Sequence, residues 1–109
     1  MSIFNIFSKD NINEGVKRFR KSENAVLLDV RTKVEYDSGH IEGSRNLPLE
    51  EISSGSLNIE NKETPLYVHC RSGARSSLAA SYLRANGYLN VHDIGGIKSY
   101  KGKLVFLAS

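Results

Sequence analysis

Apolar residues along the chain gather in short runs that predict buried strands. Ala25–Val30 and Leu66–Cys70 are continuous apolar runs of strand length, which is typical of strands covered on both faces of a parallel sheet. Asn90–Ile94 predicts a further strand, followed by a turn at Gly95-Gly96. Arg45–Leu49 predicts a short extended piece, because Pro48 removes a donor and disfavours helix at the residue before it.

Between these runs, apolar residues recur at helical spacing. Asn11 begins the first predicted helix as its N-cap, and Ile12, Val16 and Phe19 form its apolar stripe. The long helix Ala74–Asn86 ends at Gly87, and its predicted core stripe is Ala74, Leu78, Ala79, Tyr82 and Leu83.

Three shorter helices complete the predicted elements. Thr32 to Glu35 fits an S/T-x-x-E capping box, with Gly39 closing the helix that it opens. Glu50–Ser54 predicts one helical turn, and Ile97–Tyr100 a short helix. Strands that alternate with helices in this way predict an α/β fold with a mostly parallel sheet, in one domain over residues 1–109.

Composition narrows the function classes. The chain has one cysteine, so it cannot form an internal disulfide, and a reducing cytoplasm is expected. Three scattered histidines and one cysteine match no zinc spacing, so we expect no metal and no cofactor. No run is long enough to span a membrane, and Met1–Asp10 lacks the basic region of a signal peptide. The net charge of +3 favours small anionic substrates or acidic partners, and no nucleic acid is expected because basic and acidic residues are interleaved.

The most informative segment is the loop that follows Leu66–Cys70. Cys70 stands at the carboxyl end of a predicted strand, where ligands bind in open α/β sheets. Successive backbone N–H groups and the start of the next helix make a nest for an anion, and Gly73 can adopt the positive φ such loops need. Arg71 and Arg75 can pair bidentately with an oxyanion. The N–H groups, the helix start and the two arginines together favour the thiolate form of Cys70, which is the reactive form.

Other polar residues have more ordinary interpretations. His69 should point away from Cys70, because neighbours on a strand alternate faces. We interpret His69, His40 and His92 as structural histidines. Ser72 and Ser76 can donate to the anion or cap the helix, and the sequence does not separate these roles.

Three segments together resemble the rhodanese family over nearly the whole chain. The opening signature is Leu27–Arg31 with Glu35-Tyr36 and Gly39–Ser44, the active-site loop is Cys70–Ser76, and the closing turn is Asp93–Ile97. The chain is similar to the small, single-domain sulfurtransferases of the family. Tyr100 departs from the pattern, since many members carry tryptophan there, and we expect this to affect packing only.

The resemblance implies an open, twisted, mostly parallel sheet with helices on both faces, and a thiosulfate sulfurtransferase. Cys70 would be the nucleophile that carries a persulfide, and Asp29 and Arg31 largely a structural ion pair. The implied substrate-binding residues are Arg71, Ser72, Gly73, Ala74, Arg75 and Ser76. With no second cysteine to take the sulfur, the acceptor must be external: cyanide, a thiol or a protein.

Alternatives remain open. One is a persulfide carrier that delivers sulfur to a protein in cofactor or tRNA thiolation, docking through the basic first helix or through Lys98, Tyr100, Lys101 and Lys103. Another is a cysteine phosphatase, but that chemistry goes with five residues between cysteine and arginine, and here there are four. An arsenate reductase would also need a wider loop or a resolving thiol. The last is an interaction module with an inert cysteine.

Overall fold

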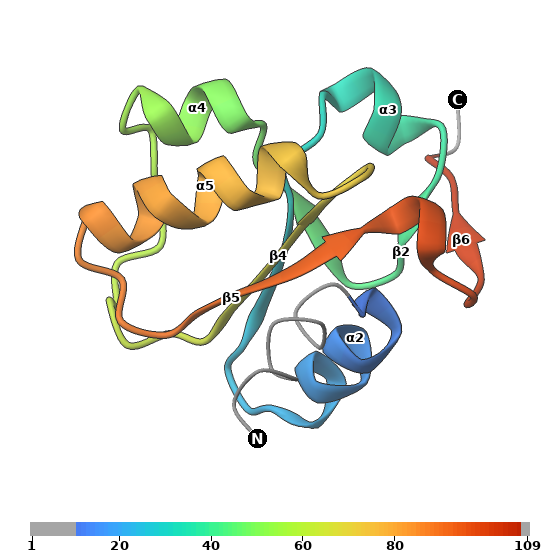
Figure 1. The fold of residues 1–109 in the computed structure, drawn as a ribbon, viewed down its shortest axis with the longest axis horizontal. Coiled ribbons are helices and arrows are strands. Elements are labelled where there is room, and N and C mark those ends of the chain that lie inside the picture. The colour runs from blue at the N-terminus through green and yellow to red at the C-terminus, as the bar shows by residue number, and fades with distance from the viewer. Residues whose placement is uncertain (1–10, 108–109) are drawn as a thin grey trace.

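A computed structural model describes residues 11–107, and Figure 1 shows their arrangement. The interpretation of Met1–Asp10 as lacking a signal peptide concerns residues outside that range. Within it, no helix combines the length and the apolar content needed to cross a bilayer. The elements in chain order are α2 (Ile12–Lys21), β1 (Val26–Asp29), α3 (Lys33–Asp37), β2 (His40–Ile41), β3 (Ser44–Asn46), α4 (Leu49–Ser53), β4 (Leu66–Cys70), α5 (Ala74–Ala85), β5 (Val91–Gly96), η2 (Ile97–Ser99) and β6 (Leu104–Val105).

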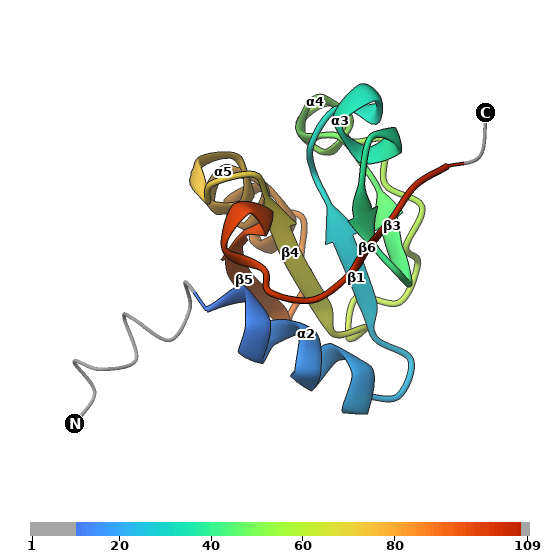
Figure 2. The same cartoon turned by 90° about the vertical axis from the view of Figure 1, so that its right-hand side faces the viewer.

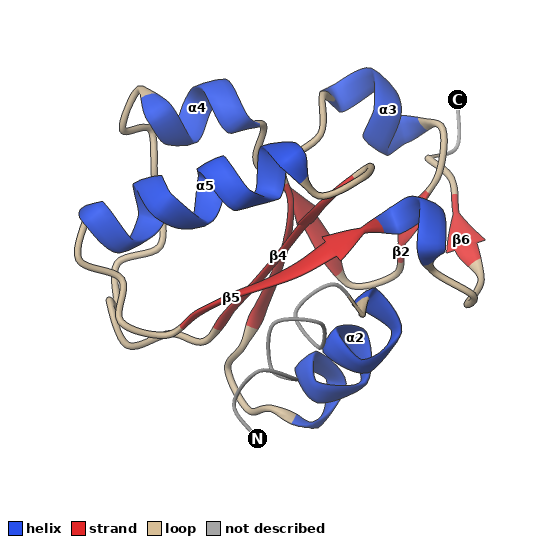
Figure 3. Cartoon of the chain, viewed as in Figure 1, coloured by secondary structure: helices blue, strands red, loops and turns tan. Residues whose placement is uncertain are grey.

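The central sheet is parallel throughout and has the strand order β3-β1-β4-β5. Its strands run side by side in Figure 2, and β2 and β6 form a separate antiparallel pair. In Figure 3, α4 and α5 lie on one side of the sheet and α2 on the other. This confirms the predicted α/β fold with a mostly parallel sheet and helices on both faces.

The sheet divides the core into two clusters. Alternate residues of β4 enter opposite clusters, because successive side chains of a strand point to opposite faces. Leu66, Val68 and Cys70 face α4 and α5, whereas Tyr67 faces α2 together with Ile12 and Val16. Cys70 is therefore anchored in the apolar layer between the sheet and α5, at the end of its strand.

Helix starts follow the local sequence signals. The Asn11 side chain accepts hydrogen bonds from two backbone N–H groups of α2, as an N-cap does. Thr32 and Glu35 form the predicted reciprocal capping box of α3. Gly87 follows the end of α5 with a positive φ, which fits its predicted place after the helix.

Two details of the predicted elements are wrong. Of the predicted stripe of α5, Ala79 and Leu83 are buried, but Ala74, Leu78 and Tyr82 are exposed, and Ser76 and Ala80 are buried in their place. The small side chains of Ala79 and Ala80 let the helix lie close to the sheet, which turns the larger Leu78 and Tyr82 outward. Gly95 and Gly96 do not form a turn: they extend β5 and pair with His69 and Cys70.

Candidate active site

The chain between β4 and α5 is a short loop, and a hydrogen bond to the sulfur of Cys70 joins its two ends. The thiol ends β4 and is 1% exposed. Its Sγ atom accepts the backbone N–H of Gly73 at 3.0 Å, and such a donor stabilises negative charge on sulfur. Gly73 has φ +110°, a conformation in which a residue with a side chain would be strained, and α5 begins at the next residue. The loop thus wraps around the sulfur and directs the first turn of a 12-residue helix toward the same place.

The backbone of the loop after Cys70 packs against β5. A Cβ atom at Gly96 would lie 2.3 Å from the carbonyl oxygen of Arg71 and 2.6 Å from the Cα atom of Ser72, so only glycine fits there. The same carbonyl of Arg71 accepts the backbone N–H of Lys98 at 3.1 Å. Gly96 and Lys98 therefore fix the position of the loop. Sequence reasoning missed both, although the adjacent glycines were a signal of close backbone approach.

The six residues after Cys70 have different surroundings. Arg71, Ser72 and Ala74 are exposed, and Arg71 is the first residue of the loop after Cys70. Ser76 is buried, and its hydroxyl donates to Asp93 Oδ1 at 2.8 Å and to the carbonyl of Gly73 at 3.1 Å. That hydroxyl holds the first turn of α5 against β5.

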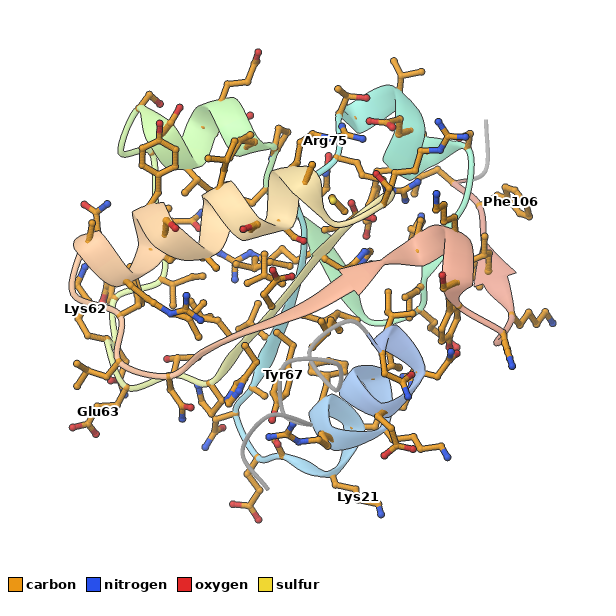
Figure 4. All side chains as sticks on the ribbon, in the orientation of Figure 1. Lys21, Lys62, Glu63, Tyr67, Arg75 and Phe106 are labelled. Carbon is orange, nitrogen blue, oxygen red and sulfur yellow. The ribbon has the colours of Figure 1, made fainter. Side chains whose placement is uncertain are left out.

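Arg75 forms a two-pronged ion pair with Glu35 of α3. Its Nη1 and Nη2 atoms donate to the two carboxylate oxygens at 2.7 and 3.0 Å. The hydrogen bond from Arg75 is the main cause that lowers the pKa of Glu35 to about 2. In return the pair raises the pKa of Arg75. Figure 4 shows Arg75 at the start of α5, on the side of the helix nearest α3. Sequence reasoning identified Glu35 only as part of the cap and of the family signature.

The histidine that precedes Cys70 has no hydrogen bond to the sulfur. His69 is fully buried, and its Nε2 atom lies 3.8 Å from Asp29 Oδ2 without a hydrogen-bond partner in the described part of the chain. Burial lowers the pKa of His69, so the ring is neutral near pH 7. His40 stacks on Tyr36 and His92 on Tyr67. Structural roles for the three histidines stay a prediction.

Asp29 and Arg31 form a buried ion pair at the carboxyl end of β1. The Nη2 atom of Arg31 donates to Asp29 at 2.7 Å and to the carbonyl of Gly39 at 2.8 Å. Asn46 donates to the carbonyl groups of both residues of the pair. This network ties β1 to the segment after α3, which is the structural role that we expected.

A groove of about 550 Å³ lies beside the start of α5. Its wall includes Arg75, Leu78 and Tyr82 of α5, with Pro48 and Leu49 at the start of α4. Leu78 and Tyr82 are 55% and 41% exposed, so the groove presents apolar surface to solvent.

The family model of the rhodanese-like domain matches residues 13–103. The chain belongs to the rhodanese-like domain family. A solved rhodanese-like domain protein of Staphylococcus aureus superposes with a TM-score of 0.75 at 30% identity, covering 90% of this chain and 96% of that one.

Curated relatives include different members of this family. The thiosulfate sulfurtransferase GlpE of Pseudomonas putida is 32% identical over 76% of this chain and 74% of its own length. The adenylyltransferase and sulfurtransferase uba4 of Ogataea parapolymorpha is 33% identical over 93% of this chain and 26% of its own length. The chain spans between 26% and 66% of the length of several curated relatives. The family thus contains both thiosulfate sulfurtransferases and larger proteins in which the domain is one part.

Proposed function

We propose that the protein is a sulfurtransferase that moves a sulfane sulfur from thiosulfate, or a similar donor, to cyanide or a thiol through a persulfide on Cys70. The observation that carries the proposal is the loop around the sulfur: Sγ accepts the N–H of Gly73 at 3.0 Å, directly before the N-terminus of α5. Donors arranged in this way stabilise a thiolate and the anion that approaches it.

The reaction has two halves. The Cys70 thiolate attacks the outer sulfur of thiosulfate, the S–S bond of the donor breaks, and sulfite leaves with the bonding electron pair. The backbone N–H groups of the loop Arg71–Ser76 and the exposed guanidinium of Arg71 bind the sulfonate and stabilise the departing sulfite. Cyanide or a thiolate then attacks the outer sulfur of the persulfide and regenerates the Cys70 thiolate.

Intact-mass measurement tests this proposal. After incubation with thiosulfate, we expect the chain to gain the mass of one sulfur atom, and cyanide to remove it. Cys70→Ser should gain nothing while its circular dichroism spectrum stays unchanged. A gain in the Cys70→Ser variant would refute Cys70 as the nucleophile. If the protein releases phosphate from p-nitrophenyl phosphate and gains no sulfur from thiosulfate, the proposal is refuted and the protein is a phosphatase.

A persulfide carrier that serves a protein acceptor is the second candidate. The apolar groove beside Arg75 favours it, because Leu78 and Tyr82 offer contact area that cyanide or a small thiol does not need. The two candidates differ in how long the persulfide lasts. After removal of the donor, an enzyme for small thiols should lose its sulfur to millimolar glutathione within seconds, whereas a carrier should keep it.

A further inference from the structure

Glu35 takes up the hydrogen-bond donors of Arg75, an arginine at the edge of the Cys70 loop. Both N–H prongs of Arg75 are directed at Glu35, at 2.7 and 3.0 Å, and both side chains are about one-third exposed. Bidentate pairing uses an edge of paired N–H donors with which an arginine would bind a sulfonate. The pair therefore leaves the exposed Arg71 as the loop arginine without an ion pair in the described part of the chain.

Glu35 is held in place from a second side. Its Oε1 atom also accepts the backbone N–H of Thr32 at 3.0 Å, in the box that caps α3. The carboxylate is therefore oriented by its own helix before it meets Arg75. Because the pKa of Glu35 is about 2, it remains charged at every pH at which the protein would work.

We propose that Glu35 sets the donor preference of the Cys70 site: it holds Arg75 away from the donor and cancels its charge, so that singly charged sulfane donors are favoured relative to dianionic thiosulfate. This inference rests on the proposed sulfur transfer. Glu35 is a positioning residue, since it acts through Arg75 and touches neither the sulfur nor the loop N–H groups.

The proposal follows from Coulomb's law. The energy of a donor in the field of the pair is proportional to the donor's charge, so a dianion responds twice as strongly as a monoanion. A unit charge about 10 Å away, at an effective dielectric between those of protein and water, changes binding of a monoanion by roughly threefold and of a dianion by roughly tenfold. The ratio of the two donors thus reports the net charge of the pair.

Thiosulfate and methanethiosulfonate make a suitable pair of donors. Thiosulfate carries two negative charges and methanethiosulfonate one. Each gives its outer sulfur to the Cys70 thiolate by the same S–S cleavage, with sulfite or methanesulfinate leaving with the electron pair. The measured quantity is kcat/KM for thiosulfate divided by kcat/KM for methanethiosulfonate, with cyanide as the common acceptor.

Three variants alter the charge of the pair step by step. Glu35→Gln makes the pair positive and keeps the cap, because glutamine serves in a capping box. We expect it to raise the donor ratio by roughly threefold, mainly through a lower KM for thiosulfate. Arg75→Gln makes the pair negative and should lower the ratio by about the same factor. The double variant restores neutrality and should return the ratio to the wild-type value.

The double variant separates this inference from direct binding. If Arg75 binds the donor in the wild-type protein, the donor ratio of the double variant will stay below the wild-type value, because neutrality does not replace the missing contact, and that would overturn the proposal. An unchanged ratio in Glu35→Gln would overturn it too. Glu14→Gln is the matched control, because it removes a paired carboxylate from α2, on the other face of the sheet, and should leave the ratio unchanged. If the wild-type protein gains no sulfur from either donor, the proposed function itself fails. If the protein gains sulfur but the donor ratio is the same in all the Glu35 and Arg75 variants, only the role of Glu35 fails.

Discussion

Replacing Gly96 with alanine tests whether β5 fixes the shape of the Cys70 loop. The backbone of Gly96 has φ −121°, which any residue adopts, so the substitution introduces no backbone strain of its own. The added methyl group would lie 2.3 Å from the carbonyl oxygen of Arg71 and 2.6 Å from the Cα atom of Ser72. Both are backbone atoms, which cannot rotate away as the end of a side chain can.

The geometry sets the size of the effect. Ordinary contact with a Cβ atom begins near 3.4 Å, so the loop must move by about 1 Å. Overpacking of this kind costs roughly 1–3 kcal/mol of folding free energy. A misplacement of about 1 Å in a site can lower a rate about 100-fold. We therefore expect Gly96→Ala to lower the rate of persulfide formation far more than its stability would suggest.

The assay is thiocyanate formation from thiosulfate and cyanide, together with urea unfolding at the same pH. Gly102→Ala is the matched control, because its methyl group would meet the hydroxyl end of the Tyr100 side chain, which can turn aside. Full activity in Gly96→Ala, with stability unchanged, would refute the argument that the strand supports the loop. Equal loss in both variants would mean that general destabilisation, rather than loop position, lowers the rate.

Further predictions concern the buried polar groups. Asp29→Asn should cost about 3 kcal/mol in urea unfolding, because it leaves the Arg31 guanidinium buried beside an uncharged partner. Ser76→Ala should cost about 1–2 kcal/mol, measured the same way, through loss of its hydrogen bonds, while Cys70 still accepts sulfur. Burial lowers the pKa of His69 below its ordinary value of 6.5. Just below pH 6.5 the histidine is therefore protonated in the unfolded chain but still neutral in the folded chain. Stability should therefore fall as pH drops below 6.5, and His69→Gln should flatten that fall; identical pH profiles for variant and wild type would contradict it.

Sequence periodicity predicted the elements better than their packing. Apolar runs located β1 and β4 because strands buried on both faces have no polar alternation. The helical stripe of α5 was ambiguous, because Leu78 and Tyr82 form one i, i+4 row and Ala79 and Leu83 another. Only the distance between helix and sheet decides between the rows, and that distance depends on residues far away in the sequence. The pair β2–β6 was not predicted, since each strand has only two residues.

The candidate site was predictable where it is continuous in sequence. Cys70, the following glycine and the start of α5 lie within a few residues, so the short loop between this strand and helix could be predicted from local order alone. The Arg75–Glu35 pair joins residues 40 positions apart. Only the parallel pairing of β1 with β4 brings their carboxyl ends together, and with them the start of α3 and the start of α5.

The support of the loop by β5 has a consequence for how the protein is made. β1 is synthesised early and Cys70 follows, but the Arg71 carbonyl gains its partner only when Lys98 has been added. Gly96, on which the loop rests, also comes late. On the ribosome, Cys70 therefore emerges well before β5, the strand that supports the loop after it. Until that later stretch of chain is released, the loop after Cys70 lacks both of these contacts, so it takes its final shape only with the completed sheet.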